Sequence, residues 1–273
     1  MNSLISKLQK EHGNNFNNGI LPFLQFPGEE DKYKILVVGG EHGDKVAGTN
    51  AMLYMADKLK SCPLKQTSVD MVPVLDTEGY PDKRTSFGGS FGFKRYLDSL
   101  YLADDRPDQI KALMNVLDAK KYDMALLLTE SFIEEAPLLS GFFIFYQMNT
   151  TSDETSNKLN FMYPEARDLG GSILSKLNTQ NIKLLDSKDG DLGDGHVIAA
   201  PGIVFQGFVE NGKMVFRTRN QFAYACQDRN IPALVLVAES SSTGKLNSKE
   251  SHIVSLEEAV RFYESISPKL GRL

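Results

Sequence analysis

The sequence predicts an α/β protein: a single domain over residues 1–273 on a mixed, mostly parallel, twisted sheet of about eight strands with helices on both faces. Short runs of almost continuously apolar residues alternate along the chain with longer segments in which apolar residues recur at helical spacing. Strands that are covered by helices on both faces have this pattern. No internal repeat or clear linker divides the chain, which favours one domain.

The order of the elements follows from these patterns. The segments with strand patterns are 20–26, 33–40, 67–75, 122–129, 140–147, 196–205 and 231–238. The segments with helical patterns are 46–60, 107–120, 164–177 and 254–266. In the first of these helices, apolar residues recur at helical spacing: Ala47, Met52, Leu53, Met55, Ala56 and Leu59.

Composition and charge exclude several classes of partner. Apolar residues make up 41% of the chain and charged residues 24%, which is ordinary for a globular protein in water. The net charge of −5 argues against a nucleic-acid groove, and no run approaches the ~20 apolar residues that a membrane span needs. The first residues lack the apolar run of a signal peptide, and the two cysteines form no CxxC pair. We therefore expect a cytoplasmic protein without a nucleic-acid or membrane partner, whose oligomeric state the sequence does not indicate.

Polar residues follow the predicted strands, where ligands bind in open α/β sheets. They are His42, Lys45, Asp76, Arg84, Arg95, Thr129, Glu130 and Glu239. Each has a purely structural interpretation as well. His42 can bond a backbone carbonyl in its turn, Glu239 can cap the following segment, and arginines in a charged loop are commonly solvated.

Several of these residues stand in recognisable motifs that occur in a fixed order. The motifs are GGEHGDKVAG (39–48), PVLDTEGY (73–80), GFKR (92–95), DMALLLTESF (123–132) followed by SGFFIFYQ (140–147), and LVLVAES (234–240). Over residues 33–265 this series resembles the zinc carboxypeptidase family in the broad sense, which includes succinylglutamate desuccinylase and aspartoacylase-like proteins. That family opens its site with a strand, a glycine-rich turn and His-x-x-Glu, and closes it with a glutamate after a late apolar strand.

The resemblance implies a zinc centre held by His, Glu and His, with an open position for water. Here His42 stands in the place of the first histidine, Lys45 in the place of the glutamate, and Thr129 in the place of the second histidine. Glu239 matches the catalytic glutamate. Arg95, together with Arg84, would bind a substrate carboxylate through its guanidinium group. The resemblance therefore implies a degenerate metal site in which His42 is the one remaining zinc ligand.

The resemblance thus implies a carboxypeptidase- or desuccinylase-like protein that binds a peptide C-terminus or an N-acyl amino acid, with little or no hydrolysis and no cofactor. The ammonium of Lys45 would take the electrostatic role of the metal and pair with Glu239, since an unpaired buried lysine is costly.

Two alternatives remain open from the sequence. One is an active zinc-dependent peptidase or amidohydrolase with altered ligands, in which His42 acts with Glu41, Asp44 or Glu130, or His196 contributes. The other is a structural protein with a vestigial cleft.

Overall fold

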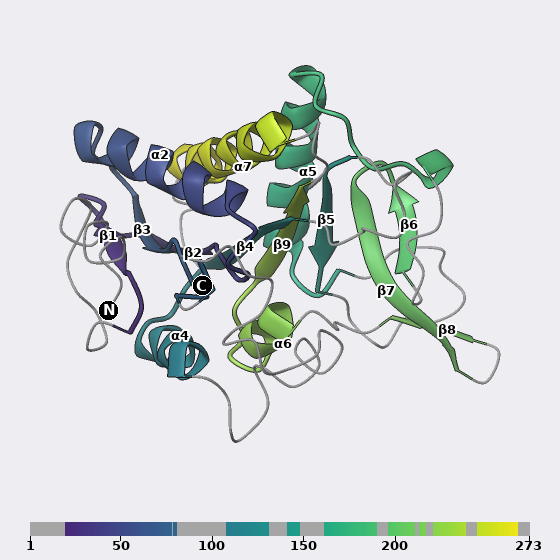
Figure 1. The fold of residues 1–273 in the computed structure, drawn as a ribbon, viewed down its shortest axis with the longest axis horizontal. Helices are drawn as coiled ribbons and strands as arrows, with labels where there is room; N and C mark the ends of the chain where they lie inside the picture. The colour runs from purple at the N-terminus through teal and green to yellow at the C-terminus, as the bar shows by residue number, and fades with distance from the viewer. Residues whose placement is uncertain are drawn as a thin grey trace.

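The computed structural model describes residues 20–77, 79–80, 108–130, 141–147, 161–189, 196–210, 213–216, 221–238 and 245–266. In these ranges nine strands form one mixed sheet, and helices cover both of its faces (Figure 1). The elements in chain order are β1 (Leu24–Phe26), β2 (Tyr33–Val38), α2 (Ala47–Ser61), β3 (Thr67–Val72), α4 (Asp108–Ala119), β4 (Met124–Glu130), β5 (Phe143–Tyr146), α5 (Pro164–Thr179), a short 3-10 helix (Ser187–Asp189), β6 (His196–Ala200), β7 (Ile203–Glu210), β8 (Lys213–Phe216), α6 (Gln221–Gln227), β9 (Ala233–Ala238) and α7 (Lys245–Ser265).

The sheet has a centre of four parallel strands, and its outer pairings are antiparallel except that β5 pairs with β7 in parallel. The strand order is β1-β3-β2-β4-β9-β5-β7-β6, and β8 pairs with β7. The central strands β3, β2, β4 and β9 run parallel, whereas β1 is antiparallel to β3 and β5 is antiparallel to β9. This architecture confirms the predicted mixed α/β sheet. It also brings the carboxyl ends of the four central strands to the same edge.

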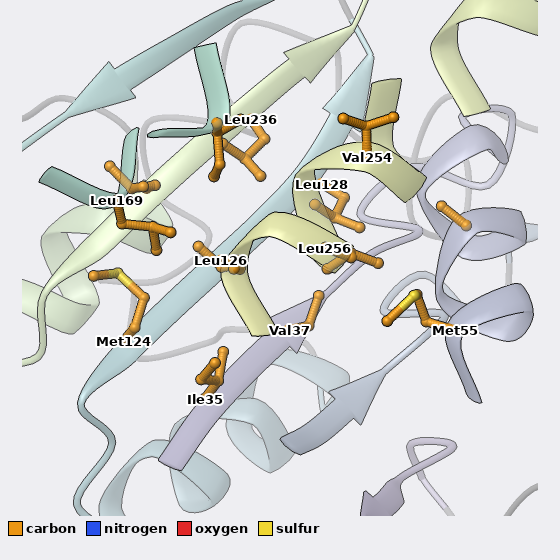
Figure 2. Packing of buried hydrophobic residues seen from close by; sticks show 14 of the residues in the cluster. Ile35, Val37, Met55, Met124, Leu126, Leu128, Leu169, Leu236, Val254 and Leu256 are labelled. Carbon is orange, nitrogen blue, oxygen red and sulfur yellow. The ribbon is translucent and has the colours of Figure 1, made fainter. Parts of the chain in front are cut away.

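Two apolar cores lie on opposite faces of the sheet, because alternate side chains of a strand point to opposite sides. On one face, residues such as Val37, Leu126 and Leu128 pack against α2, α5 and α7 (Figure 2). On the other face, Leu36, Leu127 and their neighbours pack against α4 and α6. Each fully buried leucine contributes about 1.5–3 kcal/mol. Burial on both faces explains why the central strands are apolar at nearly every position.

Several elements differ from the sequence prediction, among them β8 (Lys213–Phe216) and the short 3-10 helix, which were not predicted. The segment 196–205 was predicted as one strand, but it forms two, β6 and β7, which pair antiparallel. The reversal needs Gly202, whose φ of +76° is available mainly to glycine. Helix α6 was not predicted because its seven residues are too few to display a helical period. Helix α7 begins at Lys245 rather than at 254, and its additional turns bury Ser248, Ser251 and His252 instead of apolar side chains.

Within the described ranges, none of the helices combines the length and the hydropathy that crossing a bilayer requires.

Candidate functional site

A glycine turn joins β2 to α2 at the carboxyl edge of the sheet and carries His42. Gly40 has a φ of +58°, and a Cβ atom there would lie 2.9 Å from both the Thr49 Oγ1 and the Val74 Cα. A side chain at position 40 would therefore be strained and would also clash. This close packing buries the turn, so that the side chain of His42 is 1% exposed.

Asp76, which follows β3, ties the glycine turn to the neighbouring loop. Its carboxylate is fully buried and accepts the N–H of Gly43 at 3.2 Å and the N–H of Gly79 at 2.7 Å. The backbone N–H of Asp76 in turn donates to the carbonyl of Gly40 at 2.8 Å. Asp76 therefore fixes the geometry of the turn from one side.

Glu130, the last residue of β4, holds the same turn from the other side. Its Oε1 accepts the N–H of Ala47, the first residue of α2, at 2.8 Å. A carboxylate at a helix N-terminus satisfies a donor that has no partner within the helix and interacts favourably with the helix dipole. The sequence analysis gives Glu130 as an alternative metal ligand. In the structure its Oε1 accepts a hydrogen bond from the first residue of α2.

Lys45 places a cation within the turn. Its side chain is only 13% exposed, and its Nζ lies 3.8 Å from the Oδ2 of Asp44. The backbone N–H of Lys45 donates to the carbonyl of His42 at 3.0 Å, which closes the turn. The predicted pairing of Lys45 with Glu239 stays a prediction, because Glu239 lies outside the described residues.

Thr129 lies on β4 beside this edge, and its backbone carbonyl is engaged by a histidine. The Nε2 of His252, on α7, lies 3.0 Å from the carbonyl oxygen of Thr129. Since a carbonyl only accepts hydrogen bonds, Nε2 carries the proton and donates it, so the neutral ring has its lone pair on Nδ1. Burial lowers the pKa of His252 to about 4, although the bond to Thr129 raises it. The Nδ1 has no hydrogen-bond partner in the described part of the chain.

No sequence motif marks His252 as part of this region. The only signal is its position at helical spacing before the buried residues Leu256, Ala259 and Tyr263. Arg84 and Arg95, the predicted carboxylate-binding residues, lie outside the described ranges, so their roles remain predictions.

Two of the residues that the resemblance places at ligand positions, Lys45 and Thr129, do not supply zinc ligands. Zinc in proteins is held by imidazole, thiolate or carboxylate groups, and neither a lysine ammonium nor a threonine hydroxyl supplies such a ligand. His42 and Lys45 follow β2, and Thr129 lies on β4, the strand that pairs with β2. Among the residues that the structure describes, no three His, Cys, Asp or Glu side chains form a group that could hold a metal ion.

Comparison with known proteins gives structural matches only. No protein-family model matches the sequence, and no curated protein matches it. The cell shape determinant Csd4 of Helicobacter pylori, a D,L-carboxypeptidase, is similar over 88% of this chain with a TM-score of 0.56 and 14% identity. A metallo-carboxypeptidase of Burkholderia cenocepacia is similar over 90% of this chain with a TM-score of 0.58 and 11% identity.

A third match is nearly as long as this chain. A candidate metallopeptidase of Shewanella amazonensis has a TM-score of 0.60 and 13% identity, over 96% of this chain and 91% of its own. By contrast, this chain covers only 54% of Csd4 and 61% of the Burkholderia protein. At such low identity these matches establish the fold alone. The chain therefore has a zinc carboxypeptidase-like α/β fold.

Proposed function

We propose that this protein binds the carboxylate end of a peptide or of an N-acyl amino acid, with little or no zinc-dependent hydrolysis. The fold supports a ligand of this class, since its structural neighbours include carboxypeptidases. Csd4 in particular is described with a bound tripeptide and with bound mDAP.

The observation that carries the proposal is the placement of Lys45. Lys45 stands three residues after the buried His42, at the position where the resemblance implies a zinc-binding glutamate. There the turn holds an ammonium on a largely buried side chain. An ammonium has three N–H donors, so Lys45 can keep its contact with Asp44 and still bind a ligand carboxylate. A cation in such a partly desolvated setting binds an anion more strongly than it would in bulk water.

The same substitution argues against efficient hydrolysis. The family's zinc polarises the carbonyl and activates a water molecule, and the described residues offer His42 but not the other two ligands for it. A general base acting alone accelerates a reaction by about 10²–10⁴-fold, whereas enzymes typically reach about 10⁶–10¹⁷-fold. In this proposal Arg95, with Arg84, adds guanidinium donors for the carboxylate, and Glu239 is the group left for proton transfer.

Binding is tested first, with N-benzoylglycine as the probe carboxylate in a thermal unfolding assay. A ligand at ten times its Kd stabilises the folded state by about 1.4 kcal/mol, which raises the Tm measurably. We expect this shift for the wild type and its loss in Lys45→Met. Lys111→Met is the matched control, because Lys111 lies on α4 with its side chain 53% exposed.

Metal content is tested on the same protein, purified without chelator. We expect zinc well below one equivalent and no hydrolysis of N-benzoylglycine. One equivalent of zinc that disappears in His42→Ala, together with hydrolysis, would instead establish the active metallohydrolase. A wild type that binds no carboxylate probe would refute the proposal in favour of a vestigial site.

A further inference from the structure

Asp44 is an acidic side chain beside the proposed carboxylate-binding lysine, and one of its two oxygens has no hydrogen-bond donor among the described residues. Its Oδ2 lies 3.8 Å from the Nζ of Lys45, and the two side chains are 22% and 13% exposed. Its Oδ1 is buried and accepts no hydrogen bond in the part of the chain that the structure describes. A carboxylate oxygen removed from water without a donor is unfavourable, so this position favours a ligand that brings one.

Two other acidic residues near the turn, Asp76 and Glu130, differ from Asp44 because they accept main-chain N–H groups. Asp76 accepts the N–H groups of Gly43 and Gly79, and Glu130 accepts the N–H of Ala47. These carboxylates fix the backbone. Asp44 differs from them, because no main-chain N–H of the described residues donates to its Oδ1. Asp44 is thus placed for recognition next to Lys45.

We infer that Asp44 is a specificity residue, which accepts the N–H of the ligand's terminal residue while Lys45 binds its carboxylate. The inference rests on the proposed function. In a peptide C-terminus or an N-acyl amino acid, the amide N–H and the carboxylate are attached to the same Cα, so a donor and an anion lie side by side. Asp44 and Lys45 present the complementary arrangement, an acceptor beside a cation.

This arrangement selects amide-linked ligands over other carboxylates of the same shape. An ester of a hydroxy acid carries an oxygen in place of the N–H, and its lone pairs would face the Asp44 carboxylate. A ketone analogue carries a methylene group, which neither donates nor repels. A site built around a ligand N–H rejects analogues that lack it, because its own polar group is then left unpaired.

Three isosteric probes test this order: N-benzoylglycine with N–H, 3-benzoylpropionic acid with CH₂, and O-benzoylglycolic acid with O. Their dissociation constants are measured by NMR titration of the full-length protein at pH 7, where all three carboxylates are ionised. We expect the amide to bind about tenfold to a hundredfold more tightly than the ketone, and the ester to bind most weakly.

The variant Asp44→Asn tests whether Asp44 causes the preference. Its neutral amide can donate to the ester as readily as it accepts from the amide, so we expect the amide–ester ratio to fall to within about threefold. Asp228→Asn, at an exposed position after α6, is the matched control and should keep the wild-type ratio.

The outcomes separate the two proposals. Equal affinity of the wild type for the three probes, with binding lost in Lys45→Met, would overturn the role of Asp44 and leave the proposed function standing. An unchanged ratio in Asp44→Asn would do the same. Absence of binding by all three probes would overturn both.

Discussion

Replacing Asp76 by asparagine should measure how strongly the glycine turn is held in place. The two side chains have nearly the same shape, so the change alters hydrogen bonding and leaves packing intact. Asp76 accepts the Gly79 N–H at 2.7 Å and the Gly43 N–H at 3.2 Å, one on each oxygen. In asparagine one of these positions becomes an NH₂ group, which faces an N–H donor and cannot accept from it.

The magnitude follows from one lost bond to a charged acceptor. Such bonds contribute about 1.5–3 kcal/mol, and the N–H left behind is buried, so we expect Asp76→Asn to lower the free energy of unfolding by about 2–3 kcal/mol. Urea denaturation followed by circular dichroism measures this difference. Asp228→Asn makes the same chemical change at an exposed position and should stay within about 0.5 kcal/mol of wild type. A loss below 1 kcal/mol for Asp76→Asn would refute the account of the turn.

Three further predictions concern the scaffold. Gln147→Leu should lower the unfolding free energy by about 3 kcal/mol or more, since the buried amide accepts one backbone N–H and donates to two carbonyls; urea denaturation measures it. Gly202→Ala should lower the unfolding free energy by about 1–2 kcal/mol, because the φ there is +76° and the new Cβ would lie 2.5 Å from Leu174. Gly171→Ala lies inside α5, where a new Cβ would have no atom within 4 Å, and it should raise the unfolding free energy by about 0.5–1 kcal/mol. A loss of stability at both positions would contradict this. Burial lowers the pKa of His252 to about 4. Between this pH and about pH 6.5, the unfolded chain therefore binds a proton at His252 that the folded chain does not. We expect about 3 kcal/mol of the unfolding free energy to be lost as the pH falls from 7 to 4. The variant His252→Gln should show a shallower pH dependence in urea denaturation, and equal slopes would exclude this contribution.

The central strands were predictable because helices bury both of their faces. Residues 124–128 are buried on both faces, so nearly every position is apolar and the run stands out in the sequence. The same criterion failed over 196–205, where two apolar strands meet at Gly202. In the sequence the two strands read as one continuous apolar segment. The chain reversal between them is visible only in the backbone torsion of Gly202.

The glycine turn after β2 was predictable in its location, but the groups that hold it were not. The glycine turn after β2 identified the region of His42 and Lys45, since turns at strand ends carry a local signature. The groups that hold the turn come from far along the chain: Asp76 is 33 residues from Gly43, and Glu130 is 83 residues from Ala47. Spacing within one motif contains no information about such partners. His252, 123 residues from Thr129, is hidden for the same reason.

The groups that hold the turn in shape are separate from the side chain at position 45. Asp76 and Glu130 bind main-chain N–H groups, so they hold the loop whatever side chain occupies position 45. A loop that is held through its main chain keeps its shape when the charge of one of its side chains is changed. Its chemistry can therefore diverge while its architecture persists, which makes this edge of the sheet a suitable place to engineer a new binding preference.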